Sequence, residues 1–99
     1  MIRYTEAARA DVRALRRHGV EAYGVARSDA YADGLQLSIL RLEPFPEPSP
    51  HMPGVAPGIR VMPYRMHIVL YVVDEQGVRI LRIRHGAEDW LDFPDGGFA

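Results

Sequence analysis

The stretch from Pro44 to Gly58 is the strongest constraint on how this chain folds, because it holds six of the eight prolines in the sequence. Proline has no backbone N–H and a fixed φ angle, so such a stretch cannot form a helix or a regular ladder of strand hydrogen bonds. We therefore expect residues 44–58 to form an extended connecting loop. This loop separates a first half with helical periodicity from a second half rich in β-branched residues.

The first half has the pattern of a short strand followed by two helices. A strand is expected at residues 2–4, and the hydroxyl of Thr5 is a suitable N-cap for the helix that follows. Gly24 ends this helix, and a second helix is expected from Val25 to about Glu43. The residues at helical spacing on the inner faces are Ala8, Val12 and Leu15 in the first helix and Ser28, Tyr31, Leu35, Ile39 and Leu42 in the second. Their stripes predict an αα-hairpin.

The second half predicts a three-stranded meander. Its expected strands are 59–62, 66–73 and 78–84, joined by turns at 63–65 and 74–77. Alternation along the middle strand separates one set of side chains (Ile68, Leu70, Val72) from another (His67, Val69, Tyr71, Val73). The more apolar face, expected to pack on the helices, consists of Ile68, Leu70, Val72, Leu81 and Ile83. The opposite, polar face would carry His67, Tyr71, Arg82, Arg84 and Arg60.

Together these elements predict one α+β domain over residues 1–99. An N-terminal strand precedes the αα-hairpin, which packs on a mainly antiparallel sheet that ends in the C-terminal meander. A short helical turn and an acidic tail at 91–99 complete the chain. A domain of this size buries only about 60 to 65% of its unfolded surface, so its stability should be modest and a partner could matter greatly.

Composition excludes several classes of function. The chain has no cysteine, which removes disulfides and thiolate chemistry, and no apolar run long enough to span a membrane. Its net charge is -1, and residues 87–99 hold four acidic residues and no basic one, so no general affinity for nucleic acid is implied. The four histidines, which are His18, His51, His67 and His85, lack paired metal-ligand spacing. We expect a cytoplasmic protein without metal or cofactor.

The polar face has two interpretations. Its arginines, beside a histidine and a tyrosine, could bind phosphate or a carboxylate on a protein partner, because a guanidinium presents a planar fork of donors. Alternatively, the face is simply solvated, or its arginines pair with Glu88, Asp89 or Asp92. The sequence leaves both interpretations open.

Three motifs in the second half resemble the ParE branch of the RelE/ParE toxin superfamily. They are Gly58-Ile59-Arg60, His67 at the start of the run Ile68 to Val73, and Arg82-Ile83-Arg84-His85. The resemblance covers nearly the whole chain. It implies a type II toxin that a ParD-like antitoxin holds inactive in a hetero-oligomer, and that inhibits DNA gyrase when free. It implies an inhibitor, not an enzyme, with no sequence-specific binding of nucleic acid. The target-binding candidates are then Arg60, His67, Tyr71, Arg82 and Arg84.

Two other functions remain as alternatives. One is ribosome-dependent mRNA cleavage, as in the RelE branch, for which His67, His85, Arg65, Arg82 and Tyr71 are chemically eligible. The chain lacks the lysines of one RelE-type site and the terminal His-Tyr pair of another. The other alternative is a degenerate toxin that retains only antitoxin binding.

The second helix carries Leu37 and Leu40 on the side opposite its inner stripe. An amphipathic antitoxin helix would cover them, and the basic flank of the first helix would suit an acidic tail. The antitoxin-binding candidates are Leu37, Leu40, Arg9, Arg13, Arg16 and Arg17. Alternatively, Phe45 and Met52 of the proline-rich loop fold back over the two leucines.

Overall fold

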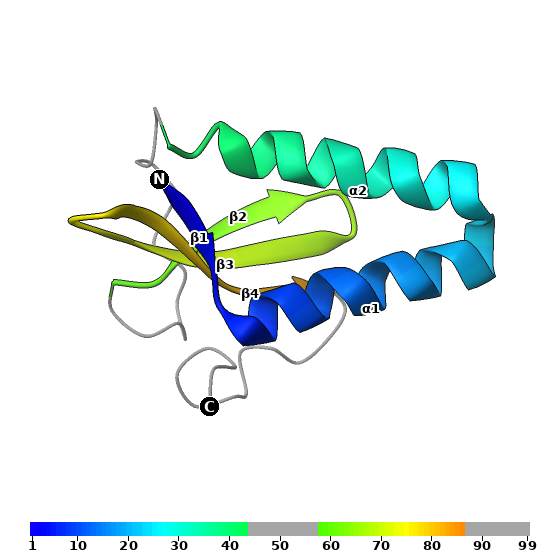
Figure 1. Cartoon of the computed structure of the whole chain (residues 1–99), viewed down its shortest axis with the longest axis horizontal. Coiled ribbons are helices and arrows are strands. Elements are labelled where there is room, and N and C mark those ends of the chain that lie inside the picture. Colours follow the sequence, from blue (N-terminus) through cyan, green and yellow to red (C-terminus); the bar gives the residue numbers. More distant parts are fainter. Residues whose placement is uncertain (44–57, 87–99) are drawn as a thin grey trace.

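The computed structural model describes residues 1–43 and 58–86 and confirms the expected α+β architecture. Its elements are β1 (Ile2–Tyr4), α1 (Glu6–Tyr23), α2 (Val25–Leu40), β2 (Arg60–Tyr64), β3 (His67–Asp74) and β4 (Gly77–His85), as labelled in Figure 1. The predictions for the loop at 44–57, the C-terminal helical turn and the tail at 91–99 lie outside the described residues. No helix in the described part of the chain is long and apolar enough to cross a membrane.

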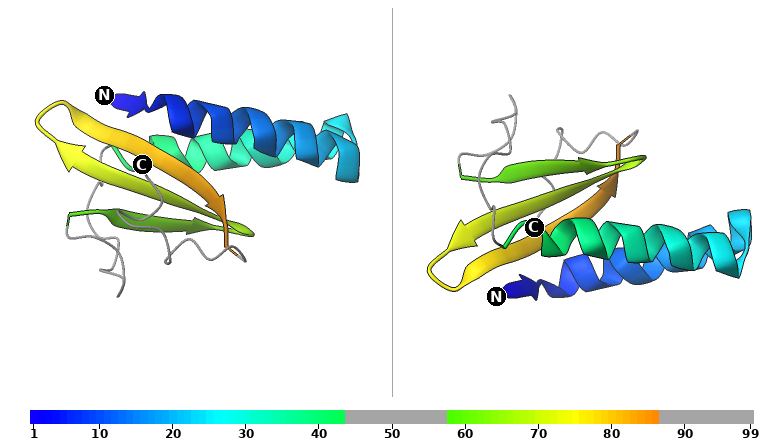
Figure 2. Two further views of the ribbon diagram at one scale, coloured as in Figure 1. Left: turned by 90° about the horizontal axis from the view of Figure 1, so that it is seen from below. Right: turned by 90° about the horizontal axis from the view of Figure 1, so that it is seen from above.

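The four strands form one sheet in the order β1-β4-β3-β2. β1 runs parallel to β4, and the other neighbours are antiparallel. Both helices lie on one face of this sheet and extend past its end, as the two views of Figure 2 agree. The hairpin is therefore supported by the sheet over only part of its length.

The ends of the helices follow local chemistry. Thr5 Oγ1 accepts a hydrogen bond from the Ala8 N–H at 3.0 Å, which confirms the predicted N-cap. The same hydroxyl donates to the Leu81 carbonyl at 2.8 Å, so the cap also ties α1 to β4. Gly24, with φ of 88°, ends α1 as predicted, whereas α2 ends at Leu40, three residues earlier than expected.

The main core lies between the helices and the sheet. Its buried members are Ala8, Leu35, Ile39, Leu42, Val69, Tyr71, Val78, Ile80 and Ile83. A second buried cluster, Val61, Ile68 and Leu70, occupies the other face of the sheet. The predicted facing of β3 is thus wrong: Val69 and Tyr71 face the helices, and Ile68 and Leu70 face away. Because both faces of this strand are apolar, alternation alone could not decide between them.

In β4, Ile83 packs in the helix-covered core as predicted, but a β-bulge at Leu81 breaks the alternation on which the rest of the facing was predicted. Leu70 pairs with Arg82 and Tyr71 with Ile80, so Leu81 is an extra residue in β4. The bulge reverses the alternation within the strand. Ile80 and Ile83 consequently point to the same, helix-covered face, although strict alternation would place them on opposite faces.

We expect Gly77→Ala to destabilise the fold more than Gly24→Ala. Both glycines have positive φ, 112° and 88°, so each alanine adds backbone strain of about 1 to 3 kcal/mol. Only at Gly77 would the new Cβ meet other atoms, lying 2.4 Å from the Met1 carbonyl oxygen, which accepts a hydrogen bond from the Val78 N–H. Urea denaturation of both variants measures the difference. Equal losses would show that the Met1 contact contributes nothing.

Candidate functional site

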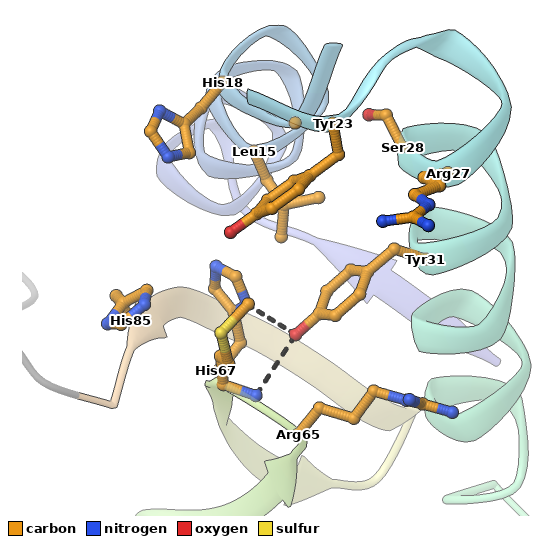
Figure 3. A pocket seen from close by; sticks show the side chains of 11 residues that line it. Leu15, His18, Tyr23, Arg27, Ser28, Tyr31, Arg65, His67 and His85 are labelled. Carbon is orange, nitrogen blue, oxygen red and sulfur yellow. Dashed lines mark hydrogen bonds between the residues drawn. The ribbon is translucent and has the colours of Figure 1, made fainter. Parts of the chain in front are cut away.

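A pocket of about 470 Å³ opens where the helical hairpin extends beyond the sheet (Figure 3). Its wall comes from both helices, from the turn between β2 and β3, and from the adjoining ends of β3 and β4. The lining residues are Leu15, His18, Gly19, Tyr23, Arg27, Ser28, Tyr31, Arg65, Met66, His67 and His85. The pocket therefore combines aromatic and apolar side chains with histidines and arginines, and among the described residues that line it there is no carboxylate.

A hydrogen bond between Tyr31 and His67 joins the two walls of this pocket. The Tyr31 hydroxyl lies 2.8 Å from His67 Nδ1, accepts from the Met66 N–H at 3.3 Å and lies 3.3 Å from the Tyr64 carbonyl oxygen. The Tyr31 phenol carries its proton at neutral pH, and burial raises its pKa further. That proton can point to His67 or to the Tyr64 carbonyl. The direction of the hydrogen bond between Tyr31 and His67 therefore depends on the tautomer of His67.

Ring contacts extend the cluster to its neighbours. The centroids of the His67 and His85 rings are 5.2 Å apart, and those of Tyr31 and Tyr64 are 5.3 Å apart, both edge-to-face. In Figure 3 the Tyr23 and Tyr31 hydroxyls both point toward His67. The site therefore depends on the relative placement of hairpin and sheet.

Arg65 holds an unusual backbone conformation at the edge of the pocket. It is the non-glycine residue with positive φ, 51°, in the described part of the chain. Its guanidinium carbon lies 5.8 Å from the centroid of the Tyr64 ring, within the range of a cation–π contact. A non-glycine side chain here costs about 1 kcal/mol or more in backbone strain.

The predicted polar face does not exist as one surface. His67 lies in the pocket on the helix-covered side of the sheet, and Arg60, which pairs with Tyr71, belongs to the same side. Tyr71 is fully buried in the main core, because it faces the helices. Arg82 and Arg84 pair with Leu70 and Ile68 and so belong to the opposite side. The five target-binding candidates are therefore divided between two faces.

Arg82 also has a structural role that the sequence did not reveal. Its Nε and Nη2 donate to the two carboxylate oxygens of Asp11 in α1 at 2.8 and 3.0 Å. Asp11 Oδ2 also accepts the Ile83 N–H at 2.9 Å. Asp11 therefore accepts a backbone N–H of β4 beyond the last residue that pairs with β1. It also joins α1 to the sheet.

We expect Asp11→Ala to lower the free energy of unfolding by about 2 to 3 kcal/mol, because it removes the partner of both a guanidinium and a backbone N–H. Arg82→Ala should cost about 1 to 2 kcal/mol, since Asp11 keeps the Ile83 N–H. Denaturant unfolding of both single variants and of the double variant measures the coupling between them. Additive losses would show that the pair does not interact.

Sequence reasoning missed most of the pocket. The sequence predicts His67 as a target-binding residue and makes His85 and Arg65 chemically eligible, but it predicts Tyr31 only as part of the inner stripe of α2. The available signal was its phenol, since a hydroxyl on a core-facing stripe needs a hydrogen-bond partner. His18 and Arg27 had no distinguishing signal. Within residues 1–43 and 58–86, no group of three or more histidines and acidic residues is arranged to hold a metal ion.

The antitoxin-binding candidates lie on the hairpin. Leu37 and Leu40 are 60% and 58% exposed, while Phe45 and Met52, which could have covered them, lie outside the described residues. Arg16 pairs with Asp29 at 3.4 Å and lies 3.9 Å from Asp33, across the hairpin. Arg9, Arg13 and Arg17 are exposed on α1 and form no ion pair with the residues that the structure describes.

Comparisons with known proteins agree with this architecture. The family model described as the ParE toxin of the type II toxin-antitoxin system, parDE, matches residues 2–90. A search of curated proteins finds no match. Among solved structures, a chromosomal ParDE toxin-antitoxin system from P. aeruginosa is similar, with 21% identity, a TM-score of 0.76, and coverage of 85% of this chain and 92% of the other. The toxin-antitoxin complex RelBE2 from Mycobacterium tuberculosis has 26% identity and a TM-score of 0.52, with coverage of 86% and 95%.

Proposed function

Because this chain belongs to the ParE toxin family of type II toxin-antitoxin systems, we propose that it inhibits DNA gyrase when free and that a ParD-like antitoxin neutralises it. The observation that carries the proposal is the family match over residues 2–90, which spans both the helical hairpin and the meander. The proposed action is inhibition by binding, so the protein itself catalyses no reaction. The similar solved structures are themselves toxin-antitoxin systems, which supports an antitoxin as the partner.

One observation favours the second candidate, ribosome-dependent mRNA cleavage. His67, His85 and Arg65 line the same pocket, and cleavage of RNA needs a base, an acid and a cation near the phosphate. Arg82 and Tyr71, which were also eligible, stand elsewhere: Arg82 is paired with Asp11, and Tyr71 is buried. The incomplete set leaves gyrase inhibition as the better-supported function.

We expect the purified toxin, free of antitoxin, to block ATP-dependent supercoiling by gyrase and to leave mRNA on translating ribosomes intact. Supercoiling is read from plasmid topoisomers, and mRNA from primer extension, over the same range of toxin concentrations. Toxin mixed beforehand with its antitoxin serves as the control and should leave supercoiling unchanged. Cleavage of ribosome-bound mRNA at concentrations that do not affect gyrase would reverse the choice between the two functions.

The solvent side of the hairpin is the proposed antitoxin surface. The Arg16 pairs with Asp29 and Asp33 mark which sides of α1 and α2 face each other there. At 100° per residue, Leu40 and Leu37 continue the side of α2 that carries Asp33 toward its C-terminal end. The helices are antiparallel and diverge from the hairpin turn, so this end of α2 lies apart from the first turns of α1 (Figure 1).

The chemistry of this surface changes along its length. Near the hairpin turn, Arg16 is matched by carboxylates of α2, whereas at the open end Arg9 and Arg13 lie on α1 and the exposed leucines on α2. Exposed leucines on one helix and arginines on the other suit an amphipathic helix that has acidic residues along one edge. This is the chemistry that we propose for the antitoxin segment.

We expect Leu37→Asp to weaken the antitoxin complex at least tenfold while changing the free energy of unfolding by less than about 0.5 kcal/mol, because Leu37 is exposed in the free toxin. Val25→Asp is the matched control, since Val25 is 61% exposed and lies at the opposite end of α2. Calorimetric titration with antitoxin and urea denaturation give the two readouts. Equal weakening of the complex by both substitutions would show that the antitoxin does not bind specifically at the Leu37 end of α2.

A further inference from the structure

The pocket between the hairpin and the sheet has basic side chains on opposite sides. In Figure 3, His18 and His85 lie to the left of the space, whereas Arg27 and Arg65 lie to the right, and the Arg65 side chain points away from the histidines. None of the described residues that line the pocket is acidic, so the pocket attracts negative charge. One small anion cannot contact both sides. The pocket therefore suits a longer partner that carries several acidic groups.

The interior of the pocket is aromatic and apolar. Leu15, Tyr23, Tyr31 and Met66 supply its surface, and the volume of about 470 Å³ lies in the range of pockets that hold small molecules. An indole ring fits this volume and can pack against the tyrosine rings. A partner that matches the pocket thus combines an aromatic side chain with acidic residues on both sides of it.

The chain itself carries such a sequence directly after the last described residue. Residues 87–99 hold four acidic residues and no basic one, together with the single tryptophan of the protein. Trp90 is preceded by Glu88 and Asp89 and followed by Asp92 and Asp95. The acidic residues therefore lie on both sides of the aromatic ring, as the basic side chains do in the pocket.

Residues 87–99 also start at the pocket. β4 ends at His85, which lines it, and the Gly86 N–H donates to the carbonyl of Met66, another lining residue, at 2.7 Å. Trp90 is close to Gly86 in the sequence, and an extended chain of that length spans about 13 Å. A partner on so short a tether has an effective concentration in the millimolar range, so weak contacts are enough to hold it.

We propose that residues 87–99 bind in this pocket of the same chain. The Trp90 ring packs against the tyrosines, the acidic residues before it lie on the histidine side, and those after it lie on the arginine side. The bound segment joins the hairpin to the end of the sheet, beyond which the hairpin has no support from the strands. Any other molecule that enters the pocket must displace the segment. The proposal rests on neither gyrase inhibition nor antitoxin binding.

The fluorescence of Trp90 in the full chain reports the position of the segment directly, because the protein has no other tryptophan. We expect its emission to be blue-shifted relative to that of a synthetic peptide of residues 87–99. A pocket of this kind buries about 70 to 90% of the surface of what it holds, so acrylamide should quench Trp90 at least about threefold more weakly than in the peptide. This protection should not change on dilution, because the segment and the pocket belong to one chain.

Two pairs of variants test whether the pocket provides this protection. Tyr23→Ala removes part of the aromatic wall, and Val20→Ala is its control, because Val20 is exposed on the same helix and does not line the pocket. Tyr23→Ala should bring the quenching at least halfway to that of the peptide, and Val20→Ala should leave it unchanged. Arg27→Gln should also raise the quenching at low salt, whereas Arg41→Gln removes an equal charge at the other end of α2 and should not. Circular dichroism checks that each variant keeps the fold, since all four side chains are exposed.

Three results would overturn the proposal. Trp90 in the full chain could be quenched as readily as in the peptide, Tyr23→Ala and Arg27→Gln could leave its protection unchanged, or a control variant could reduce the protection as much as its partner. Protection that is lost on dilution would assign the pocket to the segment of a second copy of the chain, and would overturn binding within one chain as well.

Discussion

The position of the helical hairpin depends on how α1 completes the hydrogen bonding of β4. β1 pairs with β4 over only three residues, and the chain then leaves the sheet. The Thr5 N–H continues the ladder by donating to Ile80, the Thr5 hydroxyl donates to Leu81, and Asp11 accepts from Ile83. The backbone N–H of Thr5, its hydroxyl and the Asp11 carboxylate thus bond to successive backbone groups along one edge of β4. Unpaired backbone groups at a sheet edge are costly when buried, so these bonds hold α1 in one orientation.

That orientation produces the pocket. Since α1 is fixed to β4 at its N-terminal end, its C-terminal turns and the start of α2 extend past the sheet. The space beneath them is bounded by side chains of both layers, and the bond between Tyr31 and His67 closes it from the other side. The pocket is therefore a product of tertiary arrangement, and no single motif in the sequence contains it.

The local signals in the sequence were reliable where one residue type decides one conformation. Thr5 as N-cap, Gly24 as helix end and the three strands of the meander needed only propensity and spacing. Local signals did not predict which face of the sheet each side chain occupies, because β3 is apolar on both sides and the extra residue at Leu81 changes the alternation partway through β4. The apolar character of both faces of β3 and the bulge in β4 are also the reasons why the target-binding candidates lie on two different faces. Asp11 and Arg82 are 71 residues apart, and nothing local predicts that they meet. Gyrase contact by Arg60, His67, Arg82 and Arg84, and antitoxin contact by the hairpin, stay predictions.

The bulge at Leu81 also makes the pairing register of β4 a determinant of its chemistry. Before the bulge the strand contributes Val78 and Ile80 to the helix-covered face, and after it Ile83 and His85. If Leu81 instead paired with Leu70 in a regular ladder, the inward and outward sets downstream would be exchanged. Two guanidinium groups would then turn toward the core, and Ile83 and His85 would leave it. Outside the bulge, this strand can therefore accept many changes of side chain during evolution but hardly any insertion or deletion, unlike a surface loop of the same length.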